Sequence, residues 1–472
     1  MRLSRWLVPL GLGGLVLLLP VPAGLEPAAW RYLALFVFVI AGLVTEPLPG
    51  AAVGVLGVTL GAALGLVKPT PAESMRWALS GFGNDVVWLI FSATTFALGY
   101  EVTGLGRRIA LTLVAKLGSK TIGLGYAIAL ADLVLAPFMP SNTARSVGTI
   151  YPVVRNIPGL YGSSPEENPR AIGAYLFWIA FATTCLTSSM FVTSQAPNLL
   201  ATEMARTIAK VDVTWTSWMM GFLPVGILLF VLTPIVTYVV YPPTIRNGSR
   251  VAEWAATELG QMGPMSRREI SMAALAGLAL VGWIFGSALV AGVIVALLVV
   301  SLMLMMGVVS WADVLNNSPG WNVLIWFATL LTLANGLGEV GFISWFANLS
   351  ASRLSTIPEM AAAVAIVAVF FLIHYLFAST SAHTAAVLPA FLAAVVAFGS
   401  AQVTPAVVLM LLYTVGIMGV LTPYGTGPAP LWYHTGYIST REFWKLGLLF
   451  GLLYLGGLLL IGFPLALRSI SP

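Results

Sequence analysis

The chain has 472 residues, of which 59% are hydrophobic and only 8% are charged. Soluble domains carry about 25% charged residues, so the composition excludes a water-soluble globular protein and predicts an all-α polytopic membrane protein. The apolar runs are continuous rather than alternating, which also excludes a β-barrel. A net charge of +5 and a single cysteine, Cys185, indicate no nucleic-acid partner, disulfide framework or cysteine-rich metal cluster.

Apolar runs of about 20 residues, the length that a bilayer requires, recur from one end of the chain to the other. We expect about eleven transmembrane helices, near residues 6–23, 30–47, 51–67, 85–104, 171–200, 215–241, 270–286, 289–308, 322–339, 404–430 and 446–467. The first run follows Arg2 and Arg5. It could instead be a secretory signal peptide, but we interpret it as a first transmembrane helix.

Two further apolar stretches, about 122–154 and 357–398, are each interrupted by a polar triplet. The triplets are Ser141, Asn142 and Thr143 in the first stretch and Ser379, Thr380 and Ser381 in the second. Polar, broken backbone at membrane depth survives only where protein buries it or where it lines a wet cavity. We therefore predict two re-entrant hairpins with the triplets at their tips.

A weakly amphipathic segment precedes each predicted hairpin, Leu105–Lys120 before the first and Gly341–Thr356 before the second. Such segments are typical of helices that lie at a membrane surface. A long apolar span also follows each hairpin, and it is broken in its middle at Thr193–Asn198 and at Leu421–Pro430. Glycine and proline interrupt helical hydrogen bonding there, so four discontinuities are expected to converge on one region.

The chain matches itself without gaps at a shift of 238 residues (322 − 84). The shift places Asn84 on Asn322, Trp88 on Trp326, Glu101 on Glu339, Ser141 on Ser379 and Arg145 on His383. Each repeat would hold five full spans and a hairpin. Because five is odd, the second repeat would be inverted relative to the first, which is typical of secondary transporters. Glu101 and Glu339 lie at span ends, where interfacial or scaffold roles are expected.

The predicted organisation is an N-terminal helix at 1–29, a first inverted repeat at 30–241, a linker at 242–269 and a second inverted repeat at 270–468. Most of the 22 Lys and Arg residues fall on one side of the membrane if the N-terminus is cytoplasmic. The positive-inside rule therefore places the N-terminus and the linker in the cytoplasm and the C-terminus outside.

The polar tips have the chemistry of an anion site. A helix that begins at mid-membrane presents free N–H groups and a positive dipole end, which bind carboxylates readily. Two facing tips would suit a molecule with an acid at each end. Arg145 has no acid near it in the sequence and would supply fixed positive charge, as would His383. A lone serine often bonds its own helix and a lone histidine is often a packing residue, but the repeat favours a functional role for all of them.

The predicted substrate-binding residues are Ser141, Asn142, Thr143, Arg145, Ser379, Thr380, Ser381, His383, Thr193, Thr422 and Thr426. No catalytic residue, cofactor or bound metal is expected.

Three motifs carry a family resemblance: PSNTAR at 140–145, FASTSAH at 377–383, and LTPYGTGPAP at 421–430 followed by Trp432–Tyr437. They resemble the divalent-anion:sodium symporter superfamily, most closely its branch of citrate/succinate and tartrate/succinate antiporters and 2-oxoglutarate/malate translocators. The resemblance implies a homodimer in the bacterial inner membrane, a scaffold domain, a mobile transport domain and elevator-type movement. It also implies that the two tips bind substrate carboxylates.

The second tip departs from the symporter pattern, because Thr380 and Ser381 stand where asparagine and threonine are usual. This loss of an amide oxygen weakens a sodium site. Arg145 and His383 would supply permanently the positive charge that sodium ions supply in a symporter, so an empty site would hold unpaired positive charge and would be costly to move across the membrane. The sequence therefore predicts sodium-independent obligate exchange of di- and tricarboxylates of the 2-oxoglutarate, malate, succinate and citrate class. The alternatives are a sodium-coupled dicarboxylate symporter of the same fold, an intramembrane enzyme with Ser379 or Ser381 as nucleophile and His383 as base, and a passive anion channel.

Overall fold

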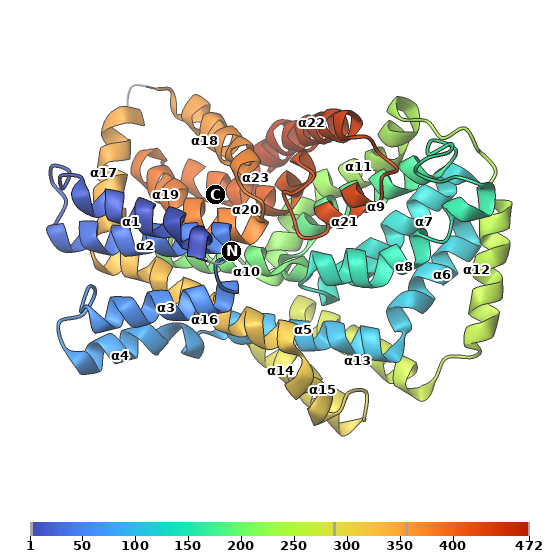
Figure 1. Ribbon diagram of the computed structural model, residues 1–472, viewed down its shortest axis with the longest axis horizontal. Coiled ribbons are helices and arrows are strands. Elements are labelled where there is room, and N and C mark those ends of the chain that lie inside the picture. The colour runs from blue at the N-terminus through green and yellow to red at the C-terminus, as the bar shows by residue number, and fades with distance from the viewer. Residues whose placement is uncertain (1–2, 287–288, 355–356, 471–472) are drawn as a thin grey trace.

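The computed structural model describes residues 3–286, 289–354 and 357–470, and these are helical almost throughout (Figure 1). Residues 1–2 of the predicted N-terminal helix and 355–356 of the predicted surface helix Gly341–Thr356 lie outside these ranges. The first half of the chain forms α1 (Leu7–Leu18), α2 (Pro27–Thr45), α3 (Gly50–Ala63), α4 (Pro71–Leu79), α5 (Asp85–Thr103), α6 (Leu105–Leu117), α7 (Thr121–Leu135), α8 (Tyr151–Val154), α9 (Gly173–Met190), α10 (Ala196–Met204) and α11 (Trp215–Val240).

After α12 (Ser249–Met262), the second half forms α13 (Arg267–Phe285), α14 (Gly292–Met305), α15 (Trp311–Asn316), α16 (Ser318–Glu339), α17 (Phe342–Leu354), α18 (Glu359–Ile373), α19 (Thr380–Phe398), α20 (Val403–Ile417), α21 (Ala429–His434), α22 (Thr440–Gly457) and α23 (Phe463–Ile470). The element order of the first half returns in the second. A long helix (α5 or α16) leads to an edge helix (α6 or α17), then to a helical pair, and then to a helix broken near its middle.

The structure confirms the predicted all-α polytopic membrane protein. Ten helices in the described ranges are long and apolar enough to cross a membrane. Three of them are hairpin arms, at Thr121–Phe138, Glu359–Leu376 and Thr380–Phe398. Three predicted spans correspond to shorter apolar helices, at Ser4–Leu18, Gly50–Ala63 and Gly292–Met305. Every span expected from the sequence thus coincides with a helix or with a helix pair.

The helices gather into two bodies (Figure 1). One body contains α3, α4, α5, α13, α14, α15 and α16, which form the lower layer in the view. The other contains the hairpins and the broken helices, with α9 packed against α7, α11 and α20, and with α10 packed against α19 and α20. The helices α6 and α17 stand at opposite ends of the molecule and connect the two bodies.

Helix starts follow ordinary capping chemistry. Asn84 accepts a hydrogen bond from the N–H of Val86 at the start of α5, and Ser266 forms a capping box with Glu269 at the start of α13. Pro27 and Pro71 occupy first helical positions, where the missing N–H is harmless. Local sequence therefore fixes where these helices begin, before any packing is considered.

The predicted linker 242–269 is largely helical. It contains α12, which packs along α6 at one edge of the molecule (Figure 1). Arg107 on α6 pairs with Glu258 on α12 at 2.6 Å, and Arg108 pairs with Glu269 at 2.6 Å. The linker is thus packed and ion-paired against α6, the helix that connects the two bodies.

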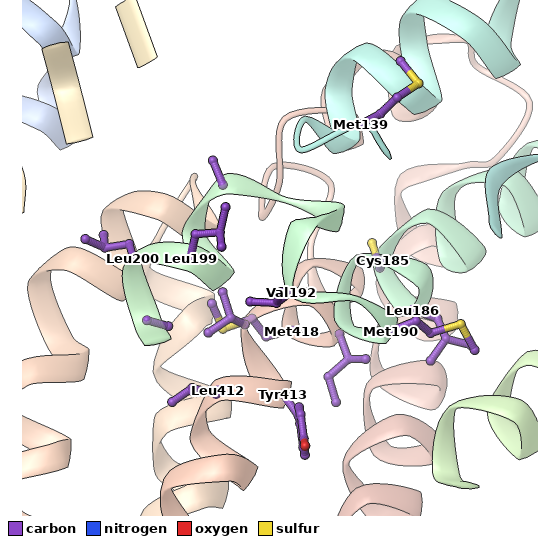
Figure 2. Packing of buried hydrophobic residues seen from close by; sticks show 14 of the residues in the cluster. Met139, Cys185, Leu186, Met190, Val192, Leu199, Leu200, Leu412, Tyr413 and Met418 are labelled. Atoms are coloured by element: carbon purple, nitrogen blue, oxygen red, sulfur yellow. The ribbon is translucent and has the colours of Figure 1, made fainter. Parts of the chain in front are cut away.

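Buried hydrophobic side chains pack around the break between α9 and α10 (Figure 2). Cys185, Leu186 and Met190 of α9 are buried there with Leu412 and Tyr413 of α20. Cys185 is fully buried in this packing as a free thiol. The broken helices are therefore held in a dense apolar setting, and their polar groups must find partners within the protein.

Candidate functional site

The first hairpin consists of α7, a short 3₁₀ turn (Ala136–Phe138), a π-helical segment (Ala144–Ile150) and α8. Its polar triplet occupies the turn between the two arms. The hydroxyl of Ser141 accepts a hydrogen bond from the N–H of Ala144 at 3.1 Å, so it caps the returning arm. Ser141 is half-buried, Asn142 is buried and Thr143 is exposed.

Arg145 lies fully buried immediately after this tip, and it is paired with Asp132. Its Nε lies 3.1 Å from Oδ2 of Asp132, which is on α7, the first arm of the same hairpin. The expectation that Arg145 supplies an unpaired positive charge is therefore wrong. Asp132 is the one acidic residue in the run 122–154, and that isolation was the signal in the sequence that could have identified it.

The rest of the guanidinium joins hairpin 1 to the first broken helix. Nη1 of Arg145 donates to the carbonyl oxygens of Met139 (3.1 Å) and Ser194 (2.8 Å), and Nη2 donates to the hydroxyl of Ser188 (3.1 Å). Asp132 in turn accepts from Thr184 at 2.5 Å. The guanidinium and the carboxylate thus have hydrogen-bond partners within the protein, so the pair holds the hairpin tip in position.

The second hairpin consists of α18, a 3₁₀ turn (His374–Leu376) and α19. Ser379 is the N-cap of α19, and its hydroxyl accepts from the N–H of Ala382 at 3.3 Å. Ser379 and Ser381 are half-buried, and Thr380 is buried. The N-terminus of α19 thus lies at the tip, as the pattern of the triplet predicted.

His383 contacts a second histidine that the sequence analysis did not select. Its Nδ1 lies 3.1 Å from Nδ1 of His374, and Nε2 of His374 lies 2.8 Å from the carbonyl oxygen of Gly425. A carbonyl only accepts, so Nε2 of His374 carries a proton, and in a neutral ring its Nδ1 is an acceptor. His383 then donates from Nδ1. Its Nε2 is left buried without a hydrogen-bond partner among the described residues.

This chain of contacts ties the second hairpin to the second broken helix. Two of the three histidines of the chain lie nine residues apart in this one hairpin, a spacing that could have identified His374 from sequence. The ring of His383 also lies against Phe370 and Phe377, with centroids 4.5 Å and 4.9 Å away. The imidazole pair is therefore enclosed between aromatic side chains and the turn around Gly425.

The two helix breaks, Thr193–Asn198 and Leu421–Pro430, both contact the tip of the first hairpin. The hydroxyl of Thr193 donates to the carbonyl oxygen of Pro137 at 2.6 Å, and the N–H of Ala196 donates to that of Pro140 at 2.7 Å. From the second break, Thr426 accepts from the amide of Asn142 at 2.8 Å. Residues far apart in the chain are thus brought together at hairpin 1.

The close approach of the second break depends on a glycine. A Cβ at Gly427 would collide with the hydroxyl of Thr143. Thr422, in the same break, is buried, and its hydroxyl has no hydrogen-bond partner among the described residues. No hydrogen bond joins the Ser141–Thr143 triplet to the Ser379–Ser381 triplet in the parts of the chain that the structure describes. The second break contacts both hairpins, through Thr426 to Asn142 and through Gly425 to His374.

A cavity of about 470 Å³ reaches this region from between the two bodies. Thr193 and Trp215 line it from the body that contains the two hairpins, which we call the hairpin body. Asp85 and Trp283 line it from the other body. Among the lining residues, Glu203 of α10 accepts from the amide of Asn84 at 3.0 Å and pairs with Arg206 at 2.7 Å. Asn84, which matches Asn322 in the internal repeat, thus makes a hydrogen bond between the two bodies.

Comparison with known proteins agrees with this architecture. Residues 1–466 match the family model described as the sodium:sulfate symporter transmembrane region. The chain is 45% identical over 471 residues to the L-tartrate/succinate antiporter of Escherichia coli (strain K12), with 97% of this chain and 96% of the relative covered. It is equally similar to the antiporter of that name from Shigella sonnei (strain Ss046), at 45% identity over the same shares of both chains.

Two solved structures share the fold. The crystal structure of the Alcanivorax borkumensis YdaH transporter superposes with a TM-score of 0.57 at 18% identity, covering 95% of this chain and all of that one. Neisseria gonorrhoeae MtrF superposes with a TM-score of 0.55 at 14% identity, covering 90% of this chain and 96% of the other. The family match extends over nearly the whole chain, and the relatives at 45% identity are named antiporters. The chain therefore belongs to the divalent-anion:sodium symporter superfamily and matches its antiporter branch.

Proposed function

We propose that the protein exchanges small dicarboxylates across the membrane by obligate antiport that does not require sodium. The observation that carries the proposal is that a serine caps a helical start at the tip of each hairpin. These serines, Ser141 and Ser379, occupy equivalent positions of the two proposed repeats. Each start offers free N–H groups and hydroxyl donors to an anion. Two such ends suit a substrate with a carboxylate at each end.

The similarity to antiporters named for tartrate and succinate supports the same class of substrate here. We propose that the exchanged anions are di- and tricarboxylates of the 2-oxoglutarate, malate, succinate and citrate class, with L-tartrate and succinate the first to be tested. Ser141, Thr143, Ser379 and Ser381 would contact the carboxylates, since their side chains are at least partly accessible. Thr422 would add a hydroxyl from the second break.

The structure changes the role that we expected for the positive charge of Arg145. Because Asp132 neutralises Arg145, this arginine does not supply spare positive charge, and we assign it a positioning role. The remaining residues proposed for the site, which are Asn142, Thr193, Thr380, His383 and Thr426, would shape and orient it. Obligate exchange would follow because an empty site would carry unsatisfied donors through a dry barrier, which is unfavourable.

The two bodies suggest how the site moves. We propose that the hairpin body slides against the body of α3, α4, α5 and α13–α16, with α6 and α17 as connecting arms, in an elevator-type movement. The contact between Asn84 and Glu203 would then break in each cycle. We further propose that the inverted repeats are 30–241 and 270–468, that 1–29 and 242–269 are appended elements, and that the protein is a homodimer in the bacterial inner membrane with a cytoplasmic N-terminus.

Counterflow in proteoliposomes tests the transport proposal. Labelled succinate or tartrate should enter only vesicles preloaded with unlabelled dicarboxylate, and replacement of sodium by potassium should not change the rate. Sodium-dependent uptake into empty vesicles would instead establish the alternative, a sodium-coupled symporter of the same fold. Sodium-independent uptake into empty vesicles would indicate a passive channel.

The geometry gives little support to an intramembrane hydrolase. The ring of His383 is directed to His374 through Nδ1, and the hydroxyl of Ser379 accepts the cap hydrogen bond of α19. A serine nucleophile needs a base within hydrogen-bond reach, and the imidazole ring of His383 makes no hydrogen bond to a serine hydroxyl among the described residues. The similarity to named antiporters supports a transporter in place of an enzyme.

A further inference from the structure

An apolar groove of about 530 Å³ runs along the N-terminal helix α1, between α1, α2 and the end of α3. Its lining residues are all apolar or glycine except one, Arg31. The guanidinium of Arg31 is exposed, and its Nε donates to the carbonyl oxygen of Pro27 at 3.3 Å. A single cation at the edge of an otherwise apolar groove is a chemically specific arrangement, and it has no part in the transport site.

The position of Arg31 within the groove follows from the helix directions. The indole N–H of Trp30 donates to the carbonyl oxygen of Leu19 at 3.3 Å, so the end of α1 lies beside the start of α2. Arg31 therefore lies at the Leu17 end of the groove. The lining extends along α1 from Leu17 back to Leu10, which at 1.5 Å per residue is about 10 Å. A bilayer leaflet has a hydrocarbon depth of about 15 Å, half of the usual 30 Å core, so the groove matches much of one acyl chain.

The groove is not filled by other parts of the described chain. On α1 only Pro9 and Gly13 are buried, while Leu10 and Leu17 are 60% and 56% exposed. A Cβ added at Gly14, which lines the groove, would meet no atom within 4 Å. Among nearby charges, Lys68 is already paired with Glu339 at 2.5 Å, and Glu26 caps the start of α2 without a side-chain hydrogen bond to the helix.

We propose that this groove binds an anionic phospholipid, with one acyl chain along the Leu10–Leu17 face of α1 and the phosphate on Arg31. Charge complementarity favours a lipid with net negative charge over a zwitterionic one, because Arg31 is the one charged residue of the lining. A basic residue at a membrane surface attracts an anionic headgroup by an amount that corresponds to roughly fivefold in affinity. The bound lipid would hold α1 against α2 and α3.

The test uses the full-length protein, delipidated in detergent, with native mass spectrometry and thermal melting as readouts. Phosphatidylglycerol should be retained about fivefold better than phosphatidylcholine with the same acyl chains, and it should raise the melting temperature more. Arg31→Ala should abolish this preference, and Arg31→Lys should keep most of it. Arg76→Ala, at an exposed arginine on α4 outside the groove, is the matched control and should leave lipid retention unchanged.

A second pair of variants tests the acyl-chain part of the site. Gly14→Phe should fill the groove and reduce retention of both lipids, whereas Gly11→Phe should not, since Gly11 is equally uncrowded but does not line the groove. Equal retention of the two lipids by the wild-type protein would overturn the proposal, as would unchanged lipid preference in Arg31→Ala. A Gly14→Phe variant that lost its dimer but kept its lipid would show that a second copy of the chain covers the groove.

Discussion

The carboxylate of Asp132 lies 3.1 Å from Nε of Arg145, and both side chains are almost completely buried within the first hairpin. The pair joins the two arms of the hairpin. Through Ser194 and Ser188 it also joins the hairpin to the first broken helix. Arg145 therefore stabilises the hairpin internally, although its sequence context suggested that its charge faces the substrate.

Arg145→Ala should destabilise the protein strongly, because it leaves the carboxylate of Asp132 buried without a cation. Breaking a buried pair in this way costs about 3–5 kcal/mol. The double variant Asp132→Asn/Arg145→Met should recover much of the lost stability, since no uncompensated charge remains. Thermal melting of the purified variants measures the effect. A single variant that melts like the wild type but no longer binds dicarboxylate would show that Arg145 contacts substrate.

The histidine pair should behave as one functional unit. His374→Leu removes the link between Gly425 and His383, and His383→Leu removes the other half of the same chain. Each single variant should slow exchange, and the double variant should be little worse than either one. Coupling between residues in contact is commonly 0.5–3 kcal/mol, which here would correspond to about a tenfold effect on rate. Counterflow rates of the three variants measure the coupling.

His434 is the matched control for the histidine pair, because it is the third histidine of the chain and its side chain is exposed. His434→Leu should leave exchange unchanged. Strictly additive losses from His374→Leu and His383→Leu would show that the two rings act independently, contrary to the expectation.

Gly427→Ala should impair exchange without unfolding the protein. The added methyl group would collide with the hydroxyl of Thr143, which is the exposed residue of the first tip. Overpacking of this kind typically costs about 1–3 kcal/mol, which is enough to displace the second break from the tip. Gly148→Ala is the control, because a Cβ at Gly148 meets no atom within 4 Å. Equal exchange by the two variants would mean that the contact between Gly427 and Thr143 does not shape the site.

Asn84→Ala should raise the exchange rate if the bodies move against each other. The amide of Asn84 donates to Glu203 across the boundary between them, and its loss destabilises the conformation described here relative to the barrier. A hydrogen bond to a charged group contributes about 1.5–3 kcal/mol, of which part would appear as a severalfold faster rate. Asn156→Ala, at an exposed asparagine within the hairpin body, should leave the rate unchanged. A slower or unaltered rate in Asn84→Ala would argue against a link that opens in each cycle.

Several features of this molecule follow from the sequence without any structure. Long apolar runs determine the helices, because a bilayer leaves no other way to satisfy the backbone of a spanning segment. Pro137 and Pro140 located the turn of the first hairpin, since they cannot continue a helix. The polar triplets located the turns of both hairpins, since Ser141 and Ser379 are natural caps. The match between Ser141 and Ser379 also indicated the repeat. These signals are local or periodic, and a linear sequence displays them directly.

Only the tertiary structure decided which charges are available and which residues meet. Asp132 reaches Arg145 because the two arms of one hairpin fold back on each other, and His374 reaches His383 and Gly425 because the second hairpin packs on the second break. The contact of Asn142 with Thr426 joins residues 284 positions apart. The sequence shows the kind of each group, but the partner that neutralises or orients a buried group depends on its position in three dimensions, and that depends on how all the helices pack.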